Sequence, residues 1–315
     1  MKITKNITLQ ISLILFLIIN TFSSFAQTIT GTVQNDKNES IEYAHVYIAA
    51  KYLGIYTFEN GTFELSDTSI QNGDTLTVSF LGYETKNIRL QSTNSQYQLG
   101  VIQLKTIVNQ LPTLTINPAN KLVTVGNPER EGFKPTGFLY GKKRIFQCQK
   151  AIFIPNKEKY IGTIETVSFW VSPHGKPKTP FRIRIYVADE NGKATGDLLT
   201  ESVIAKGLKR RKKNRWVTVD LSQYQIEIPE NGFFIAMEWL YRAEKKYNNK
   251  TKISKKNEEG EYEVIRTEIW FGQHLGGIVD KKRPNNTWIV RDGKWTQFPN
   301  RSAMHASIKA TLRVR

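Results

Sequence analysis

The sequence predicts an all-β protein with two sandwich domains, a small one followed by a larger jelly-roll-like β-sandwich. Short runs in which apolar and polar residues alternate recur along the chain, separated by turn residues, and no segment keeps a helical period. The charge is divided unevenly. Residues 1–119 carry 7 basic and 8 acidic residues, a net charge of −1, whereas residues 120–315 carry 38 and 20, a net charge of +18. This asymmetry predicts two domains with different surfaces.

The N-terminus has the composition of a targeting segment. Lys2 and Lys5 precede an apolar run from Ile7 to Ile19, and small residues follow it. This order is typical of a secretory signal peptide, which we assign to residues 1–26. The alternative, a membrane anchor, is disfavoured because the apolar run is too short to cross a bilayer comfortably.

Export sets the expected compartment and charge of the mature chain. It contains no other long apolar run, so we expect no transmembrane segment, and Gln27 in place of cysteine gives no lipid-anchor signal. We expect the protein in the periplasm or at the outer membrane and cell surface, with a net charge of about +15. The single cysteine, Cys148, excludes an intramolecular disulfide and is expected to be a small buried hydrophobe.

The first domain is predicted from a series of strand-like runs. In one of them Leu76, Val78 and Phe80 share one face, so one side is core and the other solvent, as in a small sandwich. Asn60-Gly61 predicts a two-residue hairpin between Tyr56–Phe58 and Thr62–Leu65. The landmarks of the domain are Ile29–Asp36, Tyr43–Ile48, Tyr56–Leu65, Leu76–Thr85 and a last strand within Gln91–Leu104.

These runs resemble the carboxypeptidase regulatory-like domain over about residues 28–105. The resemblance implies a transthyretin-like seven-stranded sandwich, assigned to residues 27–107, of a kind found at the N-terminus of exported Bacteroidetes proteins. It implies an accessory role in folding, spacing or docking, with no catalytic residues. Two departures from the pattern, at Tyr52-Leu53-Gly54 and at Glu59, weaken the transfer of any particular partner. The matching positions are Gly31, Val33, Ala44, Val46, Gly61, Phe63, Gly73, Leu76, Gly82 and Tyr83.

A segment rich in proline and asparagine, residues 108–131, is predicted to be a linker, and the basic sandwich follows at residues 132–315. Its most apolar strand, Gly232–Tyr241, is expected to be central. Asp292-Gly293 predicts a hairpin, and Lys245–Glu263 reads as a polar insertion forming a long mobile hairpin loop. The domain is diffusely similar to the accessory jelly-roll sandwiches of exported Bacteroidetes proteins, a resemblance that carries no site residues.

The sequence contains little that indicates a catalytic or metal site, so we expect no enzyme activity, no metal site and no cofactor. The four histidines lack metal-ligand spacing, and His45 and His305 fall on the presumed solvent faces of strands. Glu238, inside an apolar strand, could serve as a glycosidase-type acid. The alternative, that Glu238 pairs with an arginine or lies at a strand edge, is favoured because no second carboxylate is identifiable.

Basic and aromatic residues of the second domain are the candidate ligand-binding groups. A dense basic loop and a strand with a basic outer face could bind an anionic polymer, and tryptophans could stack on sugar rings. A solvated surface and a buried core are the competing interpretations. The candidates are Arg182, Arg184, Lys209, Arg210, Arg211, Lys212, Lys213, Arg215, Trp288 and Trp295.

These observations favour a non-catalytic binding or adhesion protein of the cell envelope, in which the second domain recognises a glycan or another anionic envelope component. Export makes nucleic acid an unlikely partner. Two alternatives remain: a structural or assembly partner of another exported protein, and a hydrolase with an unrecognised site.

Overall fold

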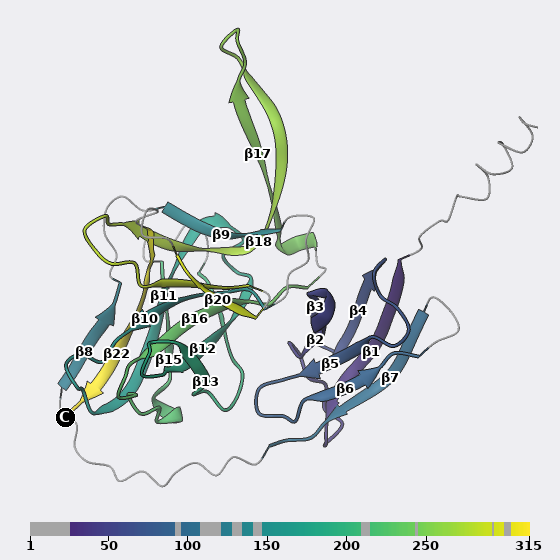
Figure 1. Cartoon of the computed structure of the whole chain (residues 1–315), viewed down its shortest axis with the longest axis horizontal. Coiled ribbons are helices and arrows are strands. Elements are labelled where there is room, and N and C mark those ends of the chain that lie inside the picture. The colour runs from purple at the N-terminus through teal and green to yellow at the C-terminus, as the bar shows by residue number, and fades with distance from the viewer. Residues whose placement is uncertain are drawn as a thin grey trace, which may run out of the picture.

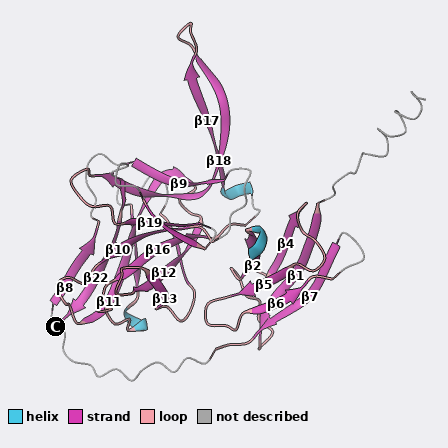
Figure 2. Ribbon diagram, viewed as in Figure 1, coloured by secondary structure: helices cyan, strands magenta, loops and turns pink. Residues whose placement is uncertain are grey.

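A computed structural model describes residues 26–91, 96–107, 121–127, 134–140, 147–208, 215–242, 245–291, 293–298 and 304–315, with only the backbone of 134–140. Two β domains lie side by side, and one long hairpin projects from the larger domain (Figures 1 and 2). Apart from strands there are three short 3-10 turns, at Ala49–Lys51, Ser222–Tyr224 and Lys245–Tyr247. The all-β prediction is confirmed for these residues. The predicted signal peptide lies almost entirely outside them.

The first domain is a seven-stranded sandwich of two sheets, as the sequence predicts. One sheet has the order β4-β1-β7 and the other the order β3-β2-β5-β6. All neighbours are antiparallel except β1 and β7, which are parallel. The strands are β1 (Gln27–Asn35), β2 (His45–Ile48), β3 (Leu53–Tyr56), β4 (Thr62–Asp67), β5 (Thr75–Ser79), β6 (Lys86–Arg89) and β7 (Gln96–Leu104).

The apolar rows predicted from alternation form the core of this sandwich. Leu76 and Val78 of β5 are fully buried, and they join Ile29, Val33 and Phe63 in one cluster contributed by both sheets. Burying one face of each sheet is the main stabilising contribution, because the hydrophobic effect scales with the apolar area removed from water.

The predicted Asn60-Gly61 hairpin is wrong in its pairing. The turn exists, since the Phe58 N–H donates to the Thr62 carbonyl oxygen at 2.8 Å. However, β3 pairs with β2, and β4 pairs with β1 in the other sheet. The turn therefore carries the chain from one sheet to the other, because turn chemistry fixes a reversal and not the partners of the strands that leave it.

The second domain is a larger sandwich whose chain passes repeatedly between two sheets, as in a jelly roll. One sheet has the order β13-β12-β16-β10-β19-β20 with β14 beside β12, and the other β17-β18-β11-β22-β8 with β15 on β11 and β9 and β21 on β18. The strands are β8 (Lys121–Gly126), β9 (Lys134–Tyr140), β10 (Gln149–Ile154), β11 (Gly162–Gly175), β12 (Pro180–Ala188), β13 (Ala194–Asp197), β14 (Val203–Lys206), β15 (Trp216–Asp220), β16 (Phe233–Trp239), β17 (Asn248–Lys256), β18 (Tyr262–Val279), β19 (Thr287–Arg291), β20 (Lys294–Gln297), β21 (Met304–Ala306) and β22 (Ile308–Val314).

Apolar side chains from both sheets fill the interior of this sandwich. Phe169, Phe181, Ile183 and Ile235 are fully buried and belong to one cluster. Strand β16 is buried along its whole length and lies between β12 and β10, so the predicted central strand is confirmed. Cys148 is buried as expected.

Three connections in this domain bear on the sequence predictions. The hairpin β19–β20 forms at the predicted turn, with Arg291 paired to Lys294. The polar insertion is built as the antiparallel pair β17–β18 rather than as a loop. Strand β8 lies within the predicted linker, yet it pairs with β22 and extends the second domain's sheet.

Candidate functional site

A buried ion pair lies where the two domains meet. Arg182 of β12 is the direct register partner of Glu238 of β16, so both side chains project from the same face of the sheet. The Arg182 Nη1 atom lies 3.4 Å from Glu238 Oε2, and both residues are almost completely buried. The Nη2 group of Arg182 donates across the interface to the carbonyl oxygen of Tyr43 at 2.6 Å. The predicted pairing of Glu238 with an arginine is confirmed.

The first domain completes the coordination of this pair. The Tyr56 hydroxyl donates to Glu238 Oε1 at 2.5 Å, and the Arg182 guanidinium lies over the rings of Tyr56 and Phe80. Burial acts to raise the pKa of Glu238, but Arg182 and Arg184 outweigh it and hold that pKa below its ordinary value. Glu238 is therefore a carboxylate at neutral pH and not a proton donor.

A second group of contacts extends the interface along the end of β16. Arg242 donates to Glu42 Oε1 at 3.0 Å and to the Tyr43 hydroxyl at 2.8 Å. The Tyr56 N–H donates to the Tyr241 carbonyl oxygen at 3.1 Å. Because this face of the first domain is occupied by the second domain, another protein cannot use it while the domains are docked.

Backbone also approaches backbone closely at Gly82. A Cβ atom at this position would lie 2.8 Å from the Thr200 carbonyl oxygen of the second domain, and Gly82 has a φ of 88°. Any other residue would push the two domains apart and strain the turn. The glycine of the family pattern at this position thus permits the docked arrangement.

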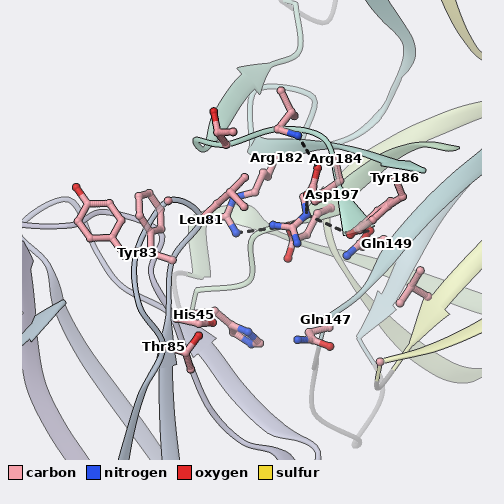
Figure 3. Close-up of a pocket in the computed structure, with 18 of the residues that line it drawn as sticks. His45, Leu81, Tyr83, Thr85, Gln147, Gln149, Arg182, Arg184, Tyr186 and Asp197 are labelled. Atoms are coloured by element: carbon pink, nitrogen blue, oxygen red, sulfur yellow. Dashed lines mark hydrogen bonds and ion pairs between the residues drawn. The ribbon is translucent and has the colours of Figure 1, made fainter. Parts of the chain in front are cut away.

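A cavity of about 460 Å³ opens beside the buried ion pair, between the two domains (Figure 3). Its size is within the range of small-molecule sites. The first domain contributes His45 and the segment after β5, and the second contributes side chains of β10, β12 and the β19–β20 hairpin. The lining residues are His45, Ser79, Phe80, Leu81, Gly82, Tyr83, Thr85, Ile107, Gln147, Gln149, Arg182, Arg184, Tyr186, Asp197, Leu199, Thr200, Glu238, Val290, Gly293 and Trp295.

The charges inside this cavity compensate one another. Arg184 Nε lies 2.8 Å from Asp197 Oδ2 and also donates to the Tyr186 hydroxyl at 3.1 Å. Tyr186 in turn donates to Gln149 Oε1 at 2.9 Å. Burial raises the pKa of Asp197, although Arg184 opposes that shift. Two arginines and two carboxylates thus line a polar cavity that has no large net charge.

Aromatic rings form one wall of the cavity and continue beyond it. Trp295 of β20 lines the cavity and packs edge-on against Tyr186 and Phe234, with ring centroids 5.1 Å and 5.2 Å apart. Trp288 of β19 lies 6.5 Å from Trp295 on the same outer face of the sheet, beside Phe153. Both tryptophans are half-buried, which leaves part of each ring accessible. The structure therefore places Trp295 in the wall of the cavity and Trp288 beside it, outside the lining.

The predicted basic residues that the structure describes are Arg182, Arg184 and Arg215. Arg182 and Arg184 line the cavity, but both are engaged with carboxylates. The outer face of β12 was predicted to be solvated and is instead covered by the first domain, which buries Arg182. Arg215 is only 7% exposed. Lys209, Arg210, Arg211, Lys212 and Lys213 lie outside the described residues.

The expected solvent exposure of two histidines is wrong. His45 is buried between the rings of Tyr47 and Tyr56, with centroid distances of 4.4 Å and 4.7 Å, because the second domain covers this side of β2. Burial lowers the pKa of His45 to about 3. His305 is fully buried, and its Nε2 lies 3.0 Å from the Asp280 carbonyl oxygen. Alternation identifies the face of a strand but does not reveal whether water or another domain lies against it.

The sequence gives no separate indication of four lining residues of the cavity, which are His45, Gln149, Tyr186 and Asp197, or of Tyr56, which contacts Glu238. The alternation in β12 places Arg182, Arg184 and Tyr186 on one face, and this pattern is the sequence feature that indicates Tyr186 as a neighbour of the two arginines.

Within the described residues no group of three or more His, Cys, Asp or Glu side chains is arranged to hold a metal ion. The described residues also include no helix with the length and hydropathy required to cross a membrane.

The chain has distant similarity to several solved structures. Among solved structures, the chain resembles a cohesin–X-dockerin complex of Acetivibrio cellulolyticus (20% identity over 25% of this chain and 58% of that chain, TM-score 0.23). It also resembles the cysteine protease and lectin-like domains of Cwp84 of Clostridium difficile (10% identity, 59% and 37%, TM-score 0.31). The chain thus spans only 58% of the first of these structures. No curated protein sequence matches it.

The family comparison is more specific, since it agrees with the strand pattern and with the seven-stranded sandwich. Residues 29–116 match the family model of the CarboxypepD_reg-like domain. The N-terminal domain of this chain is therefore a carboxypeptidase regulatory-like domain.

Proposed function

We propose that this chain is an exported, non-catalytic binding protein of the cell envelope, and that its ligand is a glycan held in the cavity between the two domains. One observation carries the proposal: Trp295 and Tyr186 form an aromatic wall of a cavity that is also lined by amide, carboxylate and guanidinium groups and by a few apolar side chains. An aromatic ring packs against the C–H face of a sugar, and polar groups around it can bind the hydroxyls. The predicted signal peptide and the accessory domain support a location in the periplasm or at the cell surface.

The pairing of charges favours sugar hydroxyls over a polyanion at this cavity. Arg182 and Arg184 lie against Glu238 and Asp197, so they offer little uncompensated positive charge. A polyanion would have to compete with carboxylates that are already in place, and that competition costs energy in a partly buried site. Neutral hydroxyls can instead bind to the remaining donors and acceptors of Gln147 and Gln149.

The first prediction concerns the aromatic wall. Replacing Trp295 by alanine is expected to weaken glycan binding at least about fivefold, because one stacking contact contributes about 1 kcal/mol beyond its buried area. Ligands would first be identified by presenting the full-length mature protein to a glycan array. Affinities of the wild type and the Trp295→Ala variant for the best ligand would then be measured by calorimetry.

Trp216→Ala is the matched control. Trp216 is also half-buried but lies on β15 of the other sheet, where Lys309 covers its ring. This variant loses a similar side chain outside the cavity and is expected to keep wild-type affinity. Equal losses of affinity in the two variants, or binding by neither variant nor wild type to any glycan, would contradict the proposal.

Hydrolysis of a glycan is the second candidate function. Asp197 and Glu238 line one cavity and their pKa values shift in opposite directions, a feature of acid–base pairs. Their oxygens are, however, largely occupied: Asp197 Oδ1 accepts from the Leu199 and Ile185 N–H groups, and Glu238 accepts from Tyr56 and Arg182. These contacts favour a structural role. Release of reducing sugar that is abolished in Asp197→Asn would instead establish the hydrolase.

A further inference from the structure

The hairpin formed by β17 and β18 stands outside both sandwiches. Residues 262–268 of β18 pair with β17 alone, whereas Ile269–Gly277 also pair with β9. Figure 1 shows this part of the hairpin projecting from the second domain. Both faces of the ribbon are therefore open to solvent, and a two-stranded ribbon of this kind has little core of its own.

Charge is segregated between the two faces of the ribbon. Directly opposed residues of an antiparallel pair project to the same side, and alternate residues along a strand share a face. The pairs Lys256 with Tyr262, Ser254 with Val264, Lys252 with Thr267 and Lys250 with Ile269 therefore lie on one side, the lysine face. All three lysines are exposed, and Tyr262 and Val264 are 73% and 47% exposed. In the described hairpin this face carries no Asp or Glu.

On the opposite face of the ribbon, basic and acidic side chains are paired, so their charges cancel. Lys255 is the register partner of Glu263, and Arg266 Nη2 lies 2.8 Å from Glu268 Oε1. The carboxylates of the strands are therefore on this face and already have basic neighbours. The positive charge of the lysine face is left without a compensating carboxylate on its own side, beside the exposed side chains of Tyr262 and Val264.

We propose that the lysine face binds a linear acidic polysaccharide lying along the ribbon. Carboxylate or sulfate groups on the sugars would pair with the lysines, and the exposed Tyr262 ring would stack against a pyranose. The Nζ atom of Lys256 already lies 5.4 Å from the centroid of the Tyr262 ring, so a cation and a stacking surface are adjacent. This site is separate from the interdomain cavity, and it does not depend on what that cavity binds.

The tip of the hairpin argues against an anionic membrane as the partner. The turn carries Glu258, Glu259 and Glu261, all exposed. A flat anionic surface approached by the projecting tip would meet these carboxylates first and be repelled. A thin polymer can contact the lysine face along its length without approaching the turn.

The test uses alginate, a carboxylated polysaccharide, with the full-length mature protein. The Lys250→Glu/Lys252→Glu/Lys256→Glu variant is expected to bind alginate at least about tenfold more weakly at low ionic strength, and the wild-type affinity should fall as salt is added. Substitution of the same lysines by glutamine keeps the ribbon free of new repulsion and should weaken binding in the same direction. Tyr262→Ala should weaken alginate binding but leave binding of inorganic polyphosphate unchanged.

A matched charge control separates this face from the net charge of the protein. Lys37, Lys105 and Lys157 are exposed lysines away from the hairpin, and changing them to glutamate alters the net charge by the same amount. This control is expected to retain alginate binding within about twofold. Equal losses in the two triple variants would overturn the proposal. Binding of anionic lipid vesicles with the same dependence on Lys250, Lys252 and Lys256 would also overturn it.

Discussion

Replacing Arg182 by alanine is expected to lower the free energy of unfolding by about 3–5 kcal/mol, the usual effect of breaking a buried ion pair. The substitution leaves the Glu238 carboxylate buried beside Tyr56 without its cation, and it leaves the Tyr43 carbonyl oxygen without its donor. Urea denaturation at neutral pH would measure the change. Small-angle scattering of the folded variant should also show the two domains separating.

A surface ion pair provides the control for this prediction. Lys159 and Glu230 are joined at a similar distance, 3.4 Å, but their side chains are 71% and 82% exposed. Lys159→Ala is therefore expected to change the free energy of unfolding by less than about 1 kcal/mol. An Arg182→Ala variant that is no less stable than Lys159→Ala would show that the interdomain pair does not hold the domains together.

Acidification is expected to weaken the docked structure through His45. Burial lowers the folded-state pKa of His45 to about 3, while the unfolded chain takes up the proton near the ordinary value of 6.5. Between these values the unfolded state binds the extra proton, so stability is present above pH 6.5 and is lost as the pH falls toward 3. The contribution of this group is about 1.4 kcal/mol per pH unit, or about 2 kcal/mol between pH 6.5 and 5.

The measurement is the difference between the free energies of unfolding at pH 7 and pH 5, determined for the wild type and for His45→Gln. This difference should be about 2 kcal/mol smaller in the variant. His274, whose pKa burial lowers to about 4, is present in both proteins, so its contribution cancels in the comparison. An unchanged pH dependence in His45→Gln would contradict the account of this residue.

The fold of each domain follows closely from period-two alternation. The row containing Leu76 and Val78 in the first domain and the apolar strand within Gly232–Tyr241 in the second are core in the structure, as predicted. The pairing of strands is predicted less well from the sequence. The strands on either side of the Asn60-Gly61 turn, for example, belong to different sheets. A turn acts over a few residues, whereas the choice of sheet depends on contacts between distant segments.

The site was predicted only in part, and the reason lies in the interface. Arg182, Arg184 and His45 occupy the polar side of alternating strands, a pattern that serves equally for a solvated face and for a polar face covered by another domain. Trp295, one of the predicted ligand-binding residues, follows the predicted Asp292-Gly293 turn and lines the cavity. Glu238 was the one signal of the buried interface, since a carboxylate in an apolar strand requires a partner.

The central claim is that the two domains form one binding site, and filling the cavity from the first domain tests it most directly. Thr85 is exposed and lines the cavity, so Thr85→Trp should obstruct the site without disturbing either core. Thr75→Trp, at an exposed position of β5 that does not line the cavity, is the matched control. Calorimetric titration with the best glycan should show binding at least about tenfold weaker in Thr85→Trp and unchanged in Thr75→Trp. Wild-type affinity in Thr85→Trp would contradict a site shared by the two domains.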